Sequence, residues 1–302
     1  MKPGISAIVV VHNQQDLLHN CLKSLTSWVN QIIIIDLVGL DDIKSLATSF
    51  KAKYILHKNV SIVEEIRQDS LKYAEHEYIL FIDPDETIPP SLSQDLKDKL
   101  KTSQFDYFLI PRQNFVFGKW LKHSRWWPDM QTRVFRYNKV TWGTTLHAEA
   151  VATGEGYAYP SEDRFAIHHE NYRNLDEYIE KNMRYAKADA LERAKSGTNF
   201  TLVVATKLSI SELISRFFLD AGYRDGMHGL VLAILQSFYY FMVYAYYWEA
   251  KKYKDLESES TIQSFPRVWF SHGLSEVLYW DKKHNFLANI KSKLVRRLIK
   301  WK

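Results

Sequence analysis

The chain has 302 residues and a mass of 35.5 kDa; 46% of its residues are hydrophobic and 25% are charged. These proportions predict a folded chain with one large or two moderate domains, and they exclude a disordered protein, a fibrous repeat and a small disulfide scaffold. The net charge is +5, but residues 290–302 hold six Lys or Arg and no acidic residue, which leaves the first 289 residues at −1. The single cysteine, Cys21, excludes an internal disulfide and a cysteine-rich zinc site, and it fits a reducing compartment.

Short apolar runs in the first hundred residues predict strands that are covered on both faces, over 6–11, 31–36, 52–57 and 77–83. Two segments between these runs place their apolar or small residues on one face of a helix of period 3.6. These residues are Leu17, Leu18, Cys21, Leu22, Leu25 and Trp28, and then Val63, Ile66, Ser70, Leu71 and Ala74. Alternating strands and helices predict an α/β fold with a mostly parallel, Rossmann-like sheet.

The pattern changes after residue 100. A further strand is predicted over 106–111, and residues 112–170 then lose clear periodicity. From residue 174 the pattern is helical, with a polar helix over 174–195, an amphipathic helix over 200–220 and a strongly apolar helix over 227–250. We therefore predict an α/β domain over 1–172 and a helical region over 173–302.

Polar side chains follow three of the predicted strands. Asn13 comes after the first strand, Asp36 ends the second, and Asp83-Pro84-Asp85 follows the fourth. Ligands of an open parallel α/β sheet bind beyond the carboxyl ends of its strands, so these side chains are predicted to meet in one site. Asn and Asp also begin turns at such positions, and this structural alternative stays open for Asn13 and Asp36.

The pair of Asp83 and Asp85 is the more specific signal. Residues i and i+2 of an extended segment point the same way, and Pro84 biases Asp83 toward an extended conformation. We therefore expect both carboxylates to face one point. Two hard oxygen ligands at that point suit Mg²⁺ or Mn²⁺ bound together with a diphosphate.

In their order along the chain, Asn13, Asp36 and the segment FIDPDE (81–86) resemble the motifs of family 2 glycosyltransferases, which have the GT-A fold. The resemblance implies that Asn13 and Asp36 line a nucleotide-sugar site. It also implies that Asp83 and Asp85 bind the metal and the sugar diphosphate. Arg67 stands where this family usually has an arginine that faces the donor.

Further segments resemble the branch of this family that includes lipopolysaccharide core glycosyltransferases. They are RWWPDMQTRVFR (125–136), LHAEA (146–150), His168-His169, EKNMRYA (180–186) and GYRDGMHGL (222–230). The resemblance implies that Asp129 and Arg133 line the donor site. One departure is that bulky Leu37 and Val38 follow Asp36, where the family commonly has small residues.

An inverting transfer needs a base that takes the proton of the acceptor hydroxyl. Glu149 is the first choice because it stands nearest to the acidic position of the family, although Ala148 separates it from His147. His147 is the second choice, and a structural role for both residues is the alternative. We expect no metal role for His168 or His169, because no acidic or cysteine partner stands at zinc spacing.

Residues 229–248 carry no formal charge and are long enough to span a bilayer. Their aromatic residues run inward from Phe238 to Trp248, which favours a helix in the plane of the membrane interface. The basic tail over 290–302 is expected to be attracted to anionic lipid. We expect a cytoplasmic protein attached peripherally to the inner face of the cell membrane, with a buried helix or a homodimer interface as the alternative. Nucleic acid is not expected as a partner, because nothing outside the tail supports it.

The resemblance implies an inverting, metal-dependent transfer of a hexose or heptose from a nucleotide-sugar to a lipid-linked glycan, in lipopolysaccharide core or cell-surface polysaccharide synthesis. Two alternatives remain open at this stage. One is transfer of the sugar to a polyprenyl phosphate, and the other is a membrane-bound assembly subunit without catalytic activity.

Overall fold

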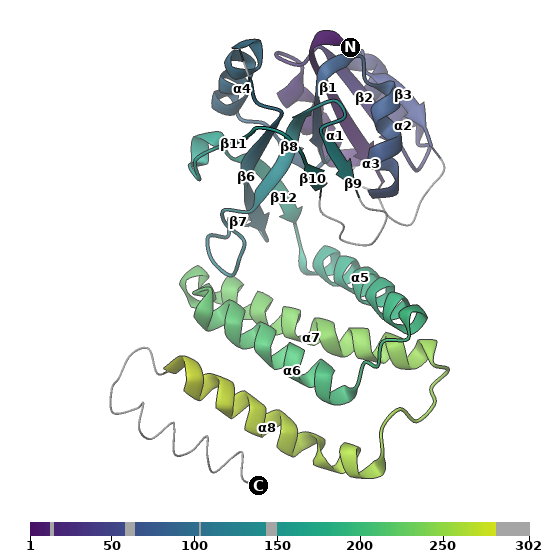
Figure 1. Cartoon of the computed structure of the whole chain (residues 1–302), viewed down its shortest axis with the longest axis vertical. Helices are drawn as coiled ribbons and strands as arrows, with labels where there is room; N and C mark the ends of the chain where they lie inside the picture. The colour runs from purple at the N-terminus through teal and green to yellow at the C-terminus, as the bar shows by residue number, and fades with distance from the viewer. Residues whose placement is uncertain (13–14, 58–63, 103, 143–149, 282–302) are drawn as a thin grey trace. The chain divides into compact units, whose positions relative to one another are not determined.

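The computed structural model describes residues 1–12, 15–57, 64–102, 104–142 and 150–281 (Figure 1). The chain divides into two compact units. The first contains residues 1–120 and 127–171, and the second contains residues 121–126 and the chain from residue 172 onward. The chain passes from the first unit to the second between residues 171 and 172, one residue before the boundary that the sequence predicts between 172 and 173.

The first half of the main sheet is parallel. Strand β1 (Lys2–Val11) lies between β2 (Gln31–Asp36) and β4 (His76–Ile82), and β3 (Lys53–Leu56) extends the sheet beyond β2. The connections hold the helices α1 (Gln15–Leu25), α2 (Asp41–Ser49), α3 (Glu64–Ser70) and the short η1 (Leu71–Tyr73). The predicted alternation of strands and helices is confirmed.

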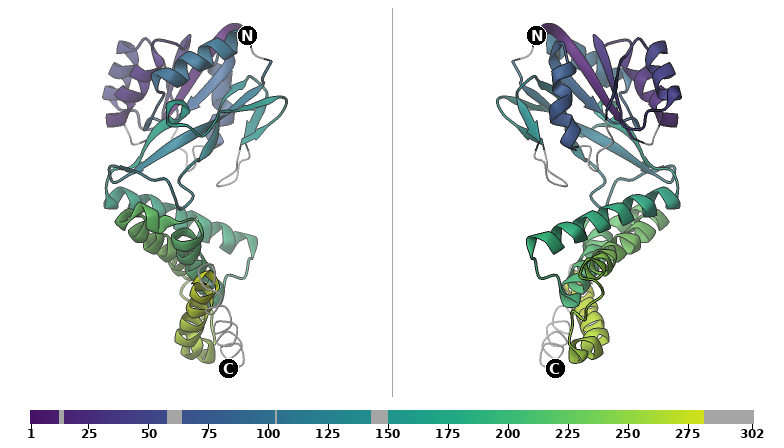
Figure 2. Two further views of the ribbon diagram at one scale, coloured as in Figure 1. Left: turned by 90° about the vertical axis from the view of Figure 1, so that its left-hand side faces the viewer. Right: turned by 90° about the vertical axis from the view of Figure 1, so that its right-hand side faces the viewer.

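Both faces of these central strands are buried, because successive residues point to opposite sides of the sheet. One face contributes Val9, Ile34 and Leu80 to a core shared with α1, α2 and α4 (Pro90–Thr102). The other face contributes Ile8, Ile33 and Ile79 to a second core shared with α3. Figure 2 shows helices on both sides of this sheet. Burial on two sides explains why the strand sequences are continuously apolar.

The second half of the sheet is mostly antiparallel. Strand β8 (Met130–Arg136) pairs with β4 and with β6 (Tyr107–Val116), and β12 (Ile167–Tyr172) lies between β6 and β5 (Glu86–Thr87). The remaining short elements are β7 (Lys119–Trp120), β11 (Gly156–Ala158), η2 (Asp163–Phe165) and the separate pair β9 (Val140–Trp142) and β10 (Ala150–Ala152).

Residues 112–170, whose sequence shows no clear periodicity, therefore contain several strands. The reason for the missing periodicity lies in the composition of the strands. Strands β8 and β12 read MQTRVFR and IHHENY, and they bury charged or polar side chains such as Arg133 and His169. A strand that buries polar groups shows neither a continuous apolar run nor a clean alternation, so its sequence does not identify it.

The second unit begins with α5 (Leu175–Ser196), whose two ends have clear causes in the sequence. The Asn174 side chain accepts a hydrogen bond from the Glu177 backbone N–H at the first turn, and Gly197 ends the helix with a φ of 72°. Next come α6 (Leu202–Ile214), a π-helical turn η3 (Ser215–Leu219), η4 (Gly222–Asp225), α7 (Met227–Ala250) and α8 (Glu259–Asp281). The sequence analysis did not predict α8.

The helices of this unit pack around α7. Its Val243 and Tyr247 share a core with Ala186 and Ala190 of α5 and with Ala205 of α6. The segment 121–126 joins the unit through polar contacts. Asp225 accepts hydrogen bonds from the backbone N–H of His123 at 2.9 Å and from Lys122 at 3.3 Å, and it contacts the His123 ring at 3.0 Å.

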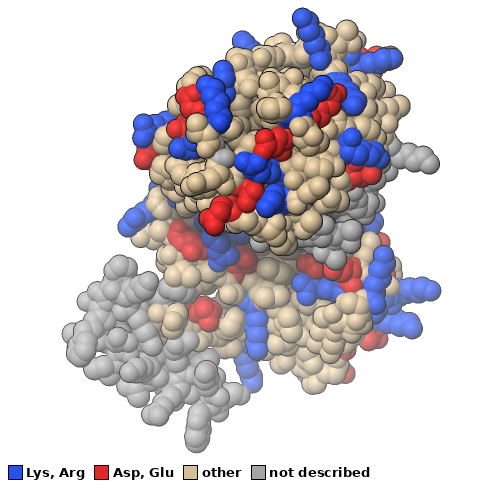
Figure 3. Space-filling view, turned by 45° about the horizontal axis from the view of Figure 1, so that its top comes forward, with Lys and Arg blue, Asp and Glu red and all other residues tan. Residues whose placement is uncertain are grey.

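On the face shown in Figure 3, Lys and Arg side chains lie among Asp and Glu side chains instead of gathering in one patch. This distribution agrees with the near-zero net charge of the first 289 residues. The net charge of +5 therefore comes from the C-terminal tail and not from the body of the protein.

Candidate active site

The acidic motif forms a tight turn at the end of β4. The Glu86 backbone N–H donates to the Asp83 carbonyl oxygen at 3.0 Å, and the Asp83 backbone N–H donates to Glu86 Oε2 at 3.1 Å. The prediction of an extended segment with both carboxylates facing one point is wrong. The fixed φ of Pro84 suits the second position of a β-turn as well as an extended strand, and the turn prevails.

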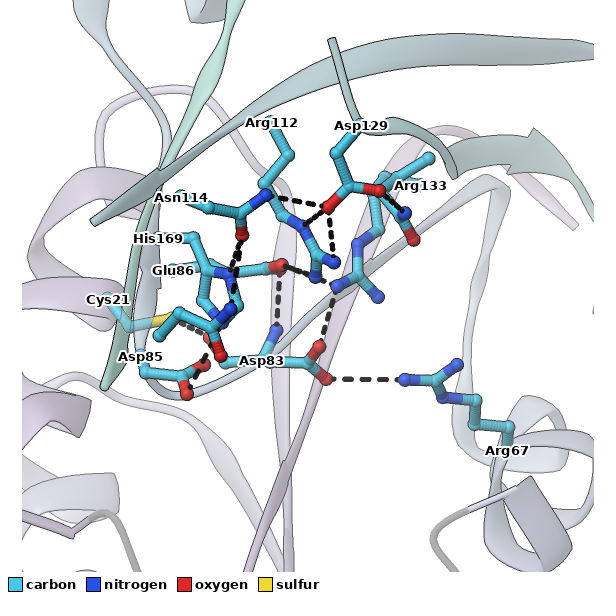
Figure 4. Close-up of polar contacts among 12 residues, drawn as sticks. Cys21, Arg67, Asp83, Asp85, Glu86, Arg112, Asn114, Asp129, Arg133 and His169 are labelled. Atoms are coloured by element: carbon cyan, nitrogen blue, oxygen red, sulfur yellow. Dashed lines mark hydrogen bonds and ion pairs between the residues drawn. The ribbon is translucent and has the colours of Figure 1, made fainter. Parts of the chain in front are cut away.

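Asp83 and Asp85 consequently face different partners (Figure 4). Asp83 binds Arg133 Nη2 at 2.6 Å and Arg67 Nη2 at 3.4 Å. Burial opposes ionisation of Asp83, but Arg133, Arg67 and Arg112 outweigh it and hold the pKa of this carboxyl far below its usual range. Asp83 is therefore a carboxylate whose charge is already matched by arginine.

Glu86 and two arginines form the buried centre of the cluster. Glu86 is fully buried, and its Oε1 contacts Arg133 Nη2 at 2.5 Å and Arg112 Nη1 at 3.0 Å. Arg112, which lies on β6, also binds Asp129 Oδ2 through Nη2 at 2.6 Å. These contacts tie the turn after β4 to β6 and to β8, so the turn is held from two neighbouring strands.

Asn114 continues the network toward β12. Its Nδ2 donates to Asp129 Oδ2 at 2.9 Å, and its Oδ1 lies 2.7 Å from His169 Nδ1. The other ring nitrogen of His169, Nε2, points to the turn and lies 3.6 Å from Asp85 Oδ2. Both Asp85 and His169 are almost completely buried. Strand pairing also brings them together, because His169 pairs with Glu86 across β12 and β5.

The pair of Asp85 and His169 fits a divalent cation. A carboxylate oxygen is a usual ligand of Mg²⁺ and Mn²⁺, and an imidazole nitrogen is a usual ligand of transition-metal ions; a diphosphate and water would supply the other positions. Among the residues that the structure describes, no cluster of three or more His, Cys, Asp or Glu side chains is arranged to hold a metal. The expectation that His169 has no acidic partner is wrong, because Asp85, which is distant in the sequence, lies beside it.

Asp36 is held at the end of β2 by three hydrogen bonds. Its Oδ1 accepts from the backbone N–H groups of Val38 at 2.8 Å and Gly39 at 2.9 Å, and its Oδ2 accepts from the Tyr54 hydroxyl at 2.8 Å. This is the turn-forming role that had stayed open beside a nucleotide role. Leu37 is buried in the core, so it does not obstruct the surface, whereas Val38 is exposed.

The remaining predicted residues divide into two groups. Arg67, Asp83, Asp85, Asp129 and Arg133 meet in the cluster of Figure 4. Asn13, His147 and Glu149 lie outside the described residues. Arg112 and Asn114 were not predicted from the sequence, and no motif marks them. Binding of a donor by any of these residues stays a prediction.

Comparison with known proteins identifies a family and several similar proteins. The sequence profile of the family described as Glycosyl transferase family 2 matches residues 6–162, slightly more than half of the chain. A poly(ribitol-phosphate) beta-glucosyltransferase of Bacillus spizizenii is 33% identical over 98 residues, which cover 28% of this chain and 15% of that protein.

Among solved structures, TarS 1–349 of S. aureus in complex with UDP-GlcNAc has a TM-score of 0.47 at 16% identity and covers 90% of this chain and 91% of that chain. Glucosyl-3-phosphoglycerate synthase of Mycobacterium tuberculosis, in complex with Mn²⁺, UDP and glucosyl-3-phosphoglycerate, has a TM-score of 0.30 at 19% identity. That alignment covers 38% of this chain and 45% of that chain. Both TM-scores are below 0.5.

Proposed function

The chain belongs to glycosyl transferase family 2, and we propose that it transfers a sugar from a nucleotide-sugar donor whose diphosphate binds beside Asp85 and His169. The observation that carries this proposal is the placement of a buried carboxylate and a buried imidazole 3.6 Å apart at the end of β4. This is the sheet edge at which ligands of such α/β folds bind.

Asp85 and His169 are the residues that would hold Mg²⁺ or Mn²⁺. When bound there, the cation supplies charge neutralisation of the diphosphate and stabilises the departing nucleotide. Asp83 would contribute through the arginines instead. The contact of Asp83 with Arg67, at 3.4 Å, is longer than its contact with Arg133, at 2.6 Å. Of the two guanidinium groups, that of Arg67 is therefore freer to bind a phosphate.

The proposed reaction inverts the configuration at the anomeric carbon. The acceptor oxygen forms a bond to this carbon while the bond to the diphosphate oxygen breaks, and the electron pair leaves with the nucleoside diphosphate. The proton of the acceptor hydroxyl passes to Glu149, with His147 as the second candidate. Exchanging Glu149 for glutamine keeps the shape and removes the base.

We therefore expect Glu149→Gln to retain donor binding and to lower kcat by at least ~10²-fold, which is the usual range for a general base. Glu155→Gln, an exposed residue with the same change of charge, is the control and should leave kcat within about twofold. Steady-state kinetics with a saturating donor measures both. A large loss for His147→Ala beside a nearly silent Glu149→Gln would assign the base to His147.

The acceptor is proposed to be a lipid-linked glycan, of the lipopolysaccharide core or another cell-surface polysaccharide, with a hexose or heptose as the donor sugar. The Bacillus spizizenii relative, which acts on poly(ribitol-phosphate), makes a polyol-phosphate polymer the second acceptor class. Transfer assays with labelled nucleotide-sugars against core oligosaccharide, poly(ribitol-phosphate) and polyprenyl phosphate separate these classes. Absence of transfer and of nucleotide-sugar binding under all conditions would support an assembly subunit instead.

Peripheral attachment to the inner face of the membrane is the proposed location, and α7 supports it. In the described part of the chain, α7 is the one helix long and apolar enough to cross a membrane; only 28% of its most apolar window is buried. Its exposed side chains include Met227, Val231, Ile234 and Phe238, which follow each other at helical spacing on one face. An in-plane helix would bury such a stripe in lipid.

Helix α8 supports the same location. It exposes Ile262, Phe270, Leu274 and Val277 along one side, and Phe270 is 73% exposed. The chain that follows α8 is strongly basic, with eight Lys or Arg and no acidic residue over 282–302. Apolar exposure next to positive charge is the combination that binds anionic lipid.

We expect Val231→Ser, Ile234→Ser and Phe238→Ser together to release the protein from anionic vesicles even at low salt, because the lost apolar burial is insensitive to salt. Removal of residues 290–302 should instead remove most of the salt dependence, since ions screen the basic tail over about 8 Å at physiological ionic strength. Vesicle co-sedimentation at two salt concentrations measures both effects.

The control for this test changes three exposed apolar residues of α5, Leu175, Ile179 and Leu191, to serine. It should sediment with vesicles like the wild type. If the wild type does not bind anionic vesicles at low salt and forms a stable dimer that the α7 triple variant breaks, the α7 stripe is a homodimer interface and the membrane proposal is wrong.

A further inference from the structure

We propose that Asn114 is a positioning residue that holds His169 in the tautomer with hydrogen on Nδ1, and so turns an unprotonated Nε2 toward Asp85. The inference rests on the proposed function, because it concerns the nitrogen that would meet the cation. It assigns a task to a buried amide that no motif in the sequence marks.

The orientation of the Asn114 amide follows from its neighbour Asp129. Three side chains hold the pKa of Asp129 below its usual value against the effect of burial: Arg112 by charge and hydrogen bonding, and Asn114 and Gln131 by hydrogen bonding. An ionised carboxylate only accepts hydrogen bonds. The Asn114 atom at 2.9 Å from Asp129 Oδ2 must therefore be the NH₂ group, which leaves the carbonyl oxygen facing His169.

The tautomer of His169 follows from that orientation. The Asn114 Oδ1 atom can only accept, so His169 Nδ1 at 2.7 Å must carry the hydrogen. In a neutral imidazole the other nitrogen, Nε2, then has a lone pair. Asn114 and His169 are 1% and 4% exposed, so water does not replace either bond.

In the neutral ring, the Nε2 lone pair faces a carboxylate across 3.6 Å. Two acceptors facing each other gain nothing from a direct contact, whereas both are satisfied by a cation between them. Backbone pairing of β5 with β12 sets the separation of the two residues, and the Glu170 N–H bond to the Asp85 carbonyl at 2.9 Å reinforces it. The Asn114 side chain determines which ring nitrogen of His169 carries the hydrogen in the neutral form. These are separate constraints, and only the second depends on Asn114.

The first test reads the tautomer directly in the full-length protein without added metal. The ¹⁵N shifts of the imidazole nitrogens distinguish the two neutral tautomers, and His169→Gln identifies the His169 signals among those of the eleven histidines. We expect the Nδ1–H form in the wild type. An Nε2–H form in the wild type overturns the proposal without recourse to any Asn114 variant.

The second test measures Mn²⁺ affinity from the free-ion signal in electron paramagnetic resonance. Asn114→Leu should weaken Mn²⁺ binding by about 10- to 100-fold, as loss of a partner behind a metal-binding histidine usually does, and should give mixed tautomers at His169. Gln131→Met is the matched control: it removes a bond of 2.6 Å to the other oxygen of Asp129 and should leave the affinity within about twofold.

Equal Mn²⁺ affinity in Asn114→Leu and in the wild type would overturn the proposal. Failure of the proposed function has a different signature, in which Mn²⁺ binds with the predicted dependence on Asn114 but no nucleotide-sugar is bound or transferred.

Discussion

Replacing Asp85 with asparagine should abolish cation-dependent donor binding and lower kcat by at least ~10³-fold, which corresponds to about 4 kcal/mol of lost transition-state stabilisation. The change removes a charge and one metal ligand without altering the shape of the side chain. It should not harm the fold. With His169 in the neutral Nδ1–H form proposed above, an amide at residue 85 presents a donor to the Nε2 lone pair, where the carboxylate presents an acceptor 3.6 Å away.

The Asp85→Asn variant should therefore be as stable as the wild type, or more stable, while it is inactive. Such a pair of outcomes is expected where a site keeps an unfavourable arrangement for its function. Asp98→Asn on the surface of α4 makes the same change of charge and should leave activity within about twofold. Thermal melting and turnover in Mn²⁺ and in EDTA measure these effects; full activity in EDTA would refute the role of Asp85.

Replacing Arg133 with methionine should destabilise the first unit by about 3–5 kcal/mol, because it leaves two carboxylates without their shared partner inside the protein. Arg133 Nη2 contacts both Asp83 and Glu86, and Glu86 is fully buried. Burial opposes the charged form of Arg133, but Asp83 and Glu86 raise the pKa of its guanidinium above the usual value. The arginine is thus charged, and its removal leaves the buried Glu86 with Arg112 alone and Asp83 with only the 3.4 Å contact to Arg67.

For a unit of this size, such a loss lowers the thermal midpoint by roughly 6–20 °C. Arg136→Met on the same strand provides the control. Arg136 pairs with Glu77 and Asp106 at a partly exposed position, where an ion pair contributes at most about 1 kcal/mol. Scanning calorimetry of both variants measures the difference. Equal shifts for Arg133→Met and Arg136→Met would show that the buried network does not hold the turn.

Much of the first unit could be predicted from its sequence, because its strands obey one simple rule. A strand such as β2, covered on both faces, must be apolar throughout, and QIIIID is recognisable without further context. The two ends of α5 can also be recognised in the sequence, since Asn174 and Gly197 act through contacts within a few residues. Features that depend only on neighbouring residues in the chain can therefore be recognised from the sequence.

The chemistry of the site could be predicted only in part, because its contacts join strands that are distant in the sequence. The DPD motif was visible, but whether its carboxylates face a metal or an arginine depends on Arg133 and His169, which lie on β8 and β12. Pro84 was compatible with both a turn and an extended segment. The link from Asn114 to His169 is a contact between two polar residues on neighbouring strands, and only the fold brings them together.

The proposed cation site is tested most directly by crystals of the wild type grown with Mn²⁺ and the nucleoside diphosphate of the preferred donor, measured at the manganese absorption edge. We expect one anomalous peak bonded to Asp85 Oδ2, to His169 Nε2 and to the diphosphate, with Asp83 still paired to Arg133. A peak bonded to Asp83 in place of His169, or a bound diphosphate with no metal, would contradict it.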